Sequence, residues 1–160
     1  MNAKELEERF ALGIYPRREI TVVRGEGALL WDDAGNEYID CTAGVGVANV
    51  GHAHPAVAKA IAAQAAQLVT SPGIFYNNTR GRLMQKLVSL APSGLNRVFL
   101  CNSGSESLEA AIKLARLTTG RTGLVSAMRG FHGRTLGALS ATFKYRDAFE
   151  PLLPNCIFVP

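Results

Sequence analysis

The stretch that most constrains the fold runs from Arg97 to Gly120 and reads R-V-F-L-C-N-S-G-S-E-S-L-E-A-A-I-K-L-A-R-L-T-T-G. Its apolar run, Val98–Cys101, is typical of a buried strand in a parallel sheet. Ser103 and Glu106 have the S-x-x-E spacing of a capping box, in which a hydroxyl and a carboxylate satisfy backbone donors of the first helical turn. Gly120 is placed for a left-handed C-cap. We therefore predict a strand, a tight turn and a capped helix.

The body of this helix carries an apolar stripe suited to packing on a sheet. Its members recur at helical spacing: Leu108, Ala111, Ile112 and Ala115. Glu109 and Lys113 are four residues apart in the order that favours an ion pair, so we expect their side chains to interact.

The turn before the helix collects small residues with hydroxyl groups and backbone donors: Asn102, Ser103, Gly104 and Ser105. A helix N-terminus carries about half a positive elementary charge, so a phosphate could bind there without a lysine. The alternative is plain helix capping with no ligand. Neither the P-loop pattern nor G-x-G-x-x-G occurs in this turn.

Composition excludes several classes of protein. The 160 residues are 48% hydrophobic and 19% charged, which is ordinary for a globular chain. The net charge is +4, but lysines and arginines are scattered, so the sequence does not indicate nucleic-acid binding. Three cysteines without a C-x-x-C motif fit a reducing compartment, each as a small core residue: Cys41, Cys101 and Cys156. With no signal peptide or membrane span in the pattern, we predict a cytoplasmic protein without a membrane partner.

The N-terminal third is predicted to hold a short helix and an antiparallel meander. The helix is expected over 4–12, and the three strands over 20–24, 28–32 and 37–41, with G-E-G and D-A-G-N as turns. Trp31 and Tyr38 are expected to be packing anchors of the meander.

The glycine-rich residues 42–55 are predicted to form an irregular loop whose backbone comes close to a neighbouring group. His52 and His54 raise the hypothesis of a metal site. No third ligand of suitable type lies nearby, so a structural turn is favoured and no metal is predicted.

Residues 55–160 alternate between helical and strand patterns. Helices are expected from Pro55 to Val69 and from a cap at Thr79 to Leu90, and further strands at 123–127 and 156–159. This alternation predicts an α/β domain with a largely parallel sheet. The last strand meets the end of the sequence without its covering helices, so we expect an incomplete domain.

A second site stretch, R-G-F-H-G-R-T-L-G, follows the strand that ends near Met128 and opens a helix around Thr135. Ligands of parallel α/β sheets bind at the carboxyl ends of strands, so this loop and the 102–105 turn should face one crevice. Phe131 could stack on a flat aromatic cofactor beside His132, and Arg134 could hold a substrate carboxylate with its bidentate fork. Each residue alone has a plainer interpretation as core, loop or surface.

The motifs N-S-G-S-E-S-L-E-A-A-I-K-L-A-R and G-F-H-G-R-T resemble those of the class III, fold type I aminotransferases that use pyridoxal phosphate. The acetylornithine aminotransferase branch is the most similar. D-D-A-G-N-E-Y-I-D and N-V-G-H-A-H-P are also similar to that family, so the resemblance spans nearly the whole chain. It implies that residues 1–45, a helix and a meander, belong to a small domain, and that residues 46–160 begin the large cofactor-binding domain.

The resemblance also implies roles for individual residues. Ser103, Gly104 and Ser105 would bind the phosphate of pyridoxal phosphate, Phe131 would stack on its pyridine ring with His132 in the same cofactor site, and Arg134 would hold the substrate α-carboxylate. The family forms homodimers, and residues 71–77 would contribute to the interface.

The family's Schiff-base lysine and its acidic partner of the pyridine nitrogen have no match in this sequence. None of the five lysines fits the lysine motif: Lys4, Lys59, Lys86, Lys113 and Lys144. Without that lysine no group moves the α-proton, so we expect an N-terminal portion that is inactive alone. The complete enzyme would pass an amino group from a donor such as acetylornithine to 2-oxoglutarate. Ornithine, succinyl-diaminopimelate and carrier-linked lysine precursors remain possible donors.

Two other classes of function remain open. One is a nucleotide-binding domain with G-V-G-V-A-N-V-G as its phosphate loop, although the glycine spacing does not fit the dinucleotide fingerprint. The other is a non-catalytic phosphate-binding or dimerisation module.

Overall fold

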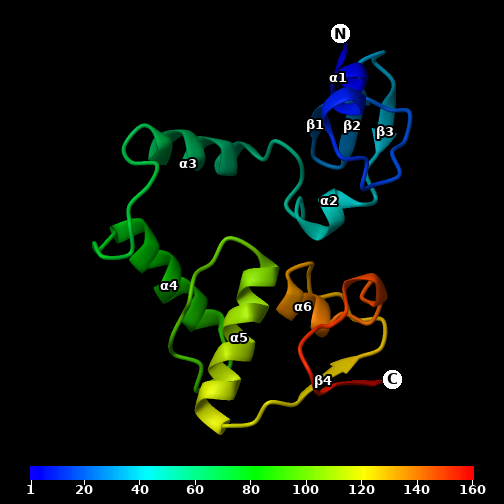
Figure 1. Cartoon of the computed structure of the whole chain (residues 1–160). Helices are drawn as coiled ribbons and strands as arrows, with labels where there is room; N and C mark the ends of the chain where they lie inside the picture. Colours follow the sequence, from blue (N-terminus) through cyan, green and yellow to red (C-terminus); the bar gives the residue numbers. More distant parts are fainter. The chain divides into compact units, whose positions relative to one another are not determined.

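The chain divides between Tyr76 and Asn77 into two units in the computed structural model, which describes residues 1–160. The first unit contains the predicted N-terminal helix, α1 (Ala3–Phe10), and a three-stranded antiparallel sheet (Figure 1). Its strands are β1 (Val22–Glu26), β2 (Leu29–Asp32) and β3 (Glu37–Ile39), in the order β1-β2-β3. The predicted meander is confirmed. The predicted domain boundary after residue 45 stays a prediction.

The two aromatic residues of the meander each contact a charged side chain, and their predicted role as packing anchors stays a prediction. The guanidinium carbon of Arg24 lies 3.5 Å from the centroid of the Trp31 ring. The Tyr38 hydroxyl donates to Asp32 Oδ2 at 2.7 Å. Asp32 is only 8% exposed and also accepts from the Asn36 side chain at 2.9 Å and the backbone N–H groups of Asn36 and Ala34. The Asn36 side chain and the Tyr38 hydroxyl, as donors, lower the pKa of Asp32 to about 2.

The glycine-rich segment after the meander forms a tight turn. A four-residue helical segment, α2 (Ala43–Gly46), occurs there, but φ is +49° at Ala43, +61° at Gly44 and +61° at Val45. The predicted irregular backbone is therefore present, but as a tight turn and not as an open loop. Asp40 fixes the turn by accepting from the N–H groups of Thr42 at 2.8 Å and Ala43 at 2.9 Å.

His52 joins this turn to the meander. Its Nε2 lies 2.7 Å from Asp40 Oδ2, and its backbone exchanges hydrogen bonds with Gly27 at 2.8 and 3.0 Å. The His52 contact, with the Thr42 and Ala43 N–H groups, lowers the pKa of Asp40. No cluster of three or more metal-ligating side chains occurs in the chain, and His52 has a structural partner. Helix α3 (Pro55–Ala65) begins as predicted but ends before Val69.

The second unit contains α4 (Asn78–Leu90) and α5 (Gly104–Thr119). The predicted cap of α4 at Thr79 is wrong, because the helix already begins at Asn78 and the Asn77 side chain accepts from the Arg80 N–H at 2.9 Å. The predicted end of α5 is confirmed, since Gly120 is left-handed with φ +69°.

The sheet of the second unit has two parallel strands, β4 (Leu124–Ala127) and β5 (Cys156–Val159), paired from Leu124 with Cys156 to Ala127 with Val159. The predicted strand at 98–101 is absent, because a strand needs a hydrogen-bonded neighbour and β4 and β5 pair only with each other. The predicted parallel pairing is confirmed for the other two strands.

The core of the second unit surrounds α6 (Leu136–Ser140), which packs against α5 (Figure 1). Of the apolar stripe predicted on α5, only Ile112 is buried, because the short α6 and not a sheet covers this helix. The buried side chains are those of Ile112, Ser126, Ala138, Leu139, Ser140, Ala141 and Thr142.

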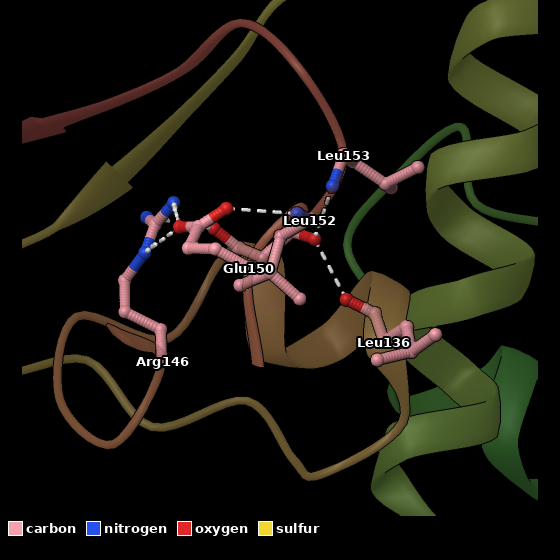
Figure 2. Close-up of polar contacts among 6 residues, drawn as sticks. Leu136, Arg146, Glu150, Leu152 and Leu153 are labelled. Atoms are coloured by element: carbon pink, nitrogen blue, oxygen red, sulfur yellow. Dashed lines mark hydrogen bonds and ion pairs between the residues drawn. The ribbon is translucent and has the colours of Figure 1, made fainter. Parts of the chain in front are cut away.

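The segment that leads from α6 to β5 is anchored by polar contacts (Figure 2). It contains a short 3-10 helix, η1 (Asp147–Phe149). The buried Ser140 hydroxyl donates to the Leu136 carbonyl at 2.6 Å and accepts from the Leu153 N–H at 2.9 Å. Arg146 pairs with Glu150 at 2.9 Å, and Glu150 accepts from the Leu152 N–H at 2.8 Å. These contacts attach the segment before β5 to α6.

The cysteines do not all lie in a core. Cys41 and Cys101 are exposed and Cys156 is half-buried, all three as free thiols. The prediction of three small core residues is therefore wrong for Cys41 and Cys101, since the loops that carry them lie at the surface. No helix has both the length and the apolar character needed to span a lipid bilayer.

Candidate functional site

The N-terminus of α5 is capped as the sequence predicts, with one change of partner. Ser103 Oγ accepts from the Glu106 N–H at 3.2 Å. The Glu106 carboxylate does not return to the Ser103 N–H; it accepts from the Asn102 N–H at 2.6 Å and contacts Asn102 Nδ2 at 3.4 Å. The cap therefore fixes the turn one residue further upstream than a standard capping box.

This cap leaves the first two donors of α5 available to a ligand. The N–H groups of Gly104 and Ser105 have no acceptor in the chain, whereas the N–H groups of Glu106 and Ser107 are bonded to Ser103. Unpaired donors at a helix N-terminus bind anions, and the hydroxyls of Ser103 and Ser105 add two more donors. The turn therefore fits a phosphate group.

The loop after β4 reaches this turn through Gly133. Gly133 has φ +137°, and a β-carbon there would overlap Ser105 Oγ and lie 2.9 Å from Ser105 Cβ. Two stretches separated by almost thirty residues are thus in direct contact, as the sequence predicts. The predicted reason is only half right, because the 98–101 segment is not a strand and the contact comes from α5 packing on α6.

Glu109 strengthens the same junction. Its Oε1 accepts from Thr135 Oγ1 at 2.6 Å and from the Gly137 N–H at 3.1 Å. The predicted pair with Lys113 is therefore wrong, because backbone and hydroxyl donors of α6 engage this carboxylate instead. Sequence reasoning missed Glu109 as a site residue, since its partners lie 26 and 28 positions away and no local spacing indicates them.

His132 is attached to the far side of the loop. Ser126 Oγ donates its single hydrogen to the Ala141 carbonyl at 2.6 Å, so toward His132 Nε2, 3.2 Å away, it acts as the acceptor. Nε2 is therefore the donor in this hydrogen bond. The His132 N–H donates to the buried Thr142 hydroxyl at 3.0 Å. These bonds fix the backbone between Phe131 and Gly133.

The two remaining predicted site residues lie at the surface of this loop. Phe131 is 59% exposed, and Arg134 is also exposed, directly between the anchored residues Gly133 and Thr135. Residues 71–77 cross the boundary between the two units, and the Tyr76 side chain is fully exposed.

Comparison with known proteins identifies the family. The family model described as "Aminotransferase class-III" matches residues 14–160. The chain belongs to the class-III aminotransferase family. The resemblance found in the sequence is therefore confirmed, and the site turn and loop both lie in the matched region of this class-III chain.

Relatives of this class-III chain are similar along its whole length. It is 49% identical over 162 aligned residues to the acetylornithine aminotransferase of Methanopyrus kandleri, covering 100% of this chain and 42% of the relative. It is 48% identical to the [LysW]-aminoadipate semialdehyde transaminase of Deinococcus radiodurans, covering 93% of this chain and 35% of that protein. The chain thus spans well under half of the length of these relatives.

A solved structure confirms the fold class. The taurine:2-oxoglutarate aminotransferase of Bifidobacterium kashiwanohense, solved with PLP and glutamate, superimposes with a TM-score of 0.90 at 27% identity, over 99% of this chain and 38% of the other. The mixed α/β arrangement of this class-III chain is therefore that of about two fifths of an aminotransferase.

Proposed function

We propose that this chain belongs to a pyridoxal-phosphate-dependent aminotransferase of amino-acid biosynthesis and carries part of its cofactor and substrate site. The observation that carries the proposal is the contact of the α5 N-terminus, with its two unpaired N–H donors, against the loop that bears Phe131 and Arg134. Family membership supports it.

The proposed cofactor contacts follow from donor chemistry. The N–H groups of Gly104 and Ser105 and the hydroxyls of Ser103 and Ser105 would hold the phosphate. Phe131 would cover one face of the ring, and His132, oriented by Ser126, would border the same site. Bound pyridoxal phosphate supplies an electron sink for the charge left on the substrate when the α-proton is removed.

Arg134 would orient the substrate through its carboxylate. A guanidinium presents two parallel donors that match a carboxylate, and this geometry fixes the amino group relative to the ring. Because Arg134 stands between two anchored residues, its backbone is held in place when a substrate arrives.

For the substrates, we propose acetylornithine or a related ornithine- or lysine-pathway amine as donor and 2-oxoglutarate as acceptor. The names of the relatives from Methanopyrus kandleri and Deinococcus radiodurans support this class of donor, and the name of the Bifidobacterium enzyme, which includes 2-oxoglutarate, supports the acceptor. Ornithine and succinyl-diaminopimelate are the other donors to compare.

The covalent lysine is proposed to come from outside these 160 residues, because none of the five lysines matches the family's lysine motif. We propose further that the enzyme is a cytoplasmic homodimer, to which residues 71–77 contribute. Borohydride reduction after addition of pyridoxal phosphate should link the cofactor covalently to the complete native protein. The isolated 160-residue chain should not reach that level of covalent attachment.

The test uses the complete native protein with pyridoxal phosphate, 2-oxoglutarate and each candidate donor, with glutamate formation as the readout. We expect turnover, and Arg134→Ala should raise the KM of the donor and of 2-oxoglutarate by about tenfold or more, because a bidentate charged contact is lost. Arg134→Lys should recover only part of the loss. An Arg134→Ala protein with unchanged KM and kcat would refute the role of Arg134, and a native protein without transamination or cofactor absorbance would refute the proposal.

A further inference from the structure

Helix α5 holds the site loop at two points on one face. Ser105 and Glu109 are four residues apart and so lie one above the other along the helix. Ser105 contacts Gly133, and Glu109 binds Thr135 and Gly137. Residues 133–137 are thereby aligned along the first turns of α5.

Position 109 supplies a hydrogen-bond acceptor to two donors at the start of α6. The Thr135 hydroxyl donates to Glu109 Oε1 and, as the N-cap of α6, accepts from the Ala138 N–H at 3.4 Å. The N–H of Gly137 belongs to the first turn of α6 and has no acceptor inside that helix. Glu109 supplies this acceptor from a neighbouring helix.

The Glu109 carboxylate lies close to the α-carbon of Gly137. A β-carbon on Gly137 would lie 2.6 Å from Glu109 Oε1 and 2.7 Å from its Cδ, so the carboxylate would have to move to admit any other residue at 137. A shift of the loop by one residue would place Leu136 or Ala138 against the carboxylate. The two hydrogen bonds of Glu109 to Thr135 and Gly137 therefore need glycine at 137 in their present geometry.

The opposite end of α6 is anchored separately. Ser140 joins it to Leu153 in the segment before β5 (Figure 2). The His132 contacts with Thr142 and Ser126 hold the start of the loop. The position of residues 133–137 along α5 then depends on the Ser105 and Glu109 contacts.

We infer that Glu109 is a positioning residue of the site: by binding Thr135 and Gly137 it sets where Arg134 and Phe131 stand relative to the N-terminus of α5. The inference rests on the proposed function, which assigns Arg134 to a carboxylate and Phe131 to the cofactor ring. The Glu109 carboxylate is engaged by Thr135 and by the Gly137 N–H of α6.

The test compares Glu109→Ala with Glu109→Gln and with the control Asp147→Ala in the complete native protein. Asp147 is an exposed acid of the same unit with no side-chain bond. For Glu109→Ala we expect the dissociation constant of pyridoxal phosphate, and the KM of a donor with an α-carboxylate, to rise by about tenfold, the effect of one lost charge-assisted hydrogen bond. The KM of an amine without an α-carboxylate should change less. Glu109→Gln keeps an acceptor oxygen and should recover much of the loss, and Asp147→Ala should behave as native.

Thr135→Val provides a second route if Glu109→Ala does not fold, because it nearly preserves side-chain shape while removing the hydroxyl donor to Glu109. It also removes the N-cap acceptor of α6, so Thr135→Ser, which keeps both bonds, is its control. Thr135→Val should produce the same selective rise in KM. The inference is overturned if a folded Glu109→Ala or Thr135→Val protein matches Asp147→Ala in cofactor affinity and in both KM values. A native protein that neither binds pyridoxal phosphate nor transaminates would instead overturn the proposed function.

Discussion

The hydroxyl of Ser105 lies against the α-carbon of Gly133, so close that a β-carbon on residue 133 would overlap it. The same β-carbon would stand 3.1 Å from Ala138 Cβ, and the backbone is held at φ +137°, which side chains rarely adopt. The loop can therefore approach α5 only with glycine at this position.

Gly133→Ala should separate the loop from the N-terminus of α5. We expect a loss of about 1–3 kcal/mol in the free energy of unfolding, because the substitution overpacks a fixed contact in a strained backbone. Cofactor affinity should fall with it. Denaturant unfolding and titration with pyridoxal phosphate measure the two effects.

Gly81→Ala is the matched control, since Gly81 lies inside α4 with open space around its α-carbon. Alanine in a helix interior is favoured over glycine by about 0.5–1 kcal/mol, so this protein should be as stable as native or more so. Equal stability losses in the two variants would refute the steric account of Gly133.

Asp32 makes the first unit sensitive to acid. Its pKa is lowered from 3.8 to about 2, first by the Asn36 side chain and then by the Tyr38 hydroxyl. A carboxyl group with a depressed folded-state pKa stabilises the fold fully above its unfolded pKa, and the contribution is lost as pH falls through the folded value. Stability of the meander should therefore decrease as pH falls from about 4 to about 2.

Trp31 is the single tryptophan and lies on the strand that ends at Asp32, so its fluorescence reports this unit. Denaturation midpoints should be measured from about pH 6 down to about pH 2 for native, Asp32→Asn and the control Asp33→Asn. The acid dependence should be weaker in Asp32→Asn and retained in Asp33→Asn. An Asp32→Asn curve parallel to the native one would contradict the assignment.

Features that depend on neighbouring residues could be predicted from the sequence. Ser103 caps the start of α5 and Gly120 caps its end, as predicted, because a cap depends only on residues of the first or last helical turn. The meander followed from alternation and turn residues for the same reason. Even the wrong cap at Thr79 missed the true one, Asn77, by only two positions.

Features that depend on distant partners could not be predicted. Val98–Cys101 has the composition of a strand but finds no neighbour to pair with. The spacing of four residues predicted an ion pair between Glu109 and Lys113. The actual partners of Glu109 lie at the start of α6, which local spacing cannot indicate. The contact between the two site stretches was expected because chain order in α/β folds brings strand ends together, but its residues, Ser105 and Gly133, came only from the structure.

The Ser140 hydroxyl should be costly to remove from the second unit. It is 0% exposed, donates to the Leu136 carbonyl and accepts from the Leu153 N–H (Figure 2). Ser140→Ala leaves that N–H without its acceptor, so we expect a loss of about 1–3 kcal/mol in the free energy of unfolding. Ser107→Ala, on the exposed surface of α5, should change it by only a few tenths of a kcal/mol. Hydrogen exchange of the Leu153 N–H should accelerate only in Ser140→Ala. An unchanged exchange rate in that variant would show that the bond from Leu153 to Ser140 does not hold the segment before β5.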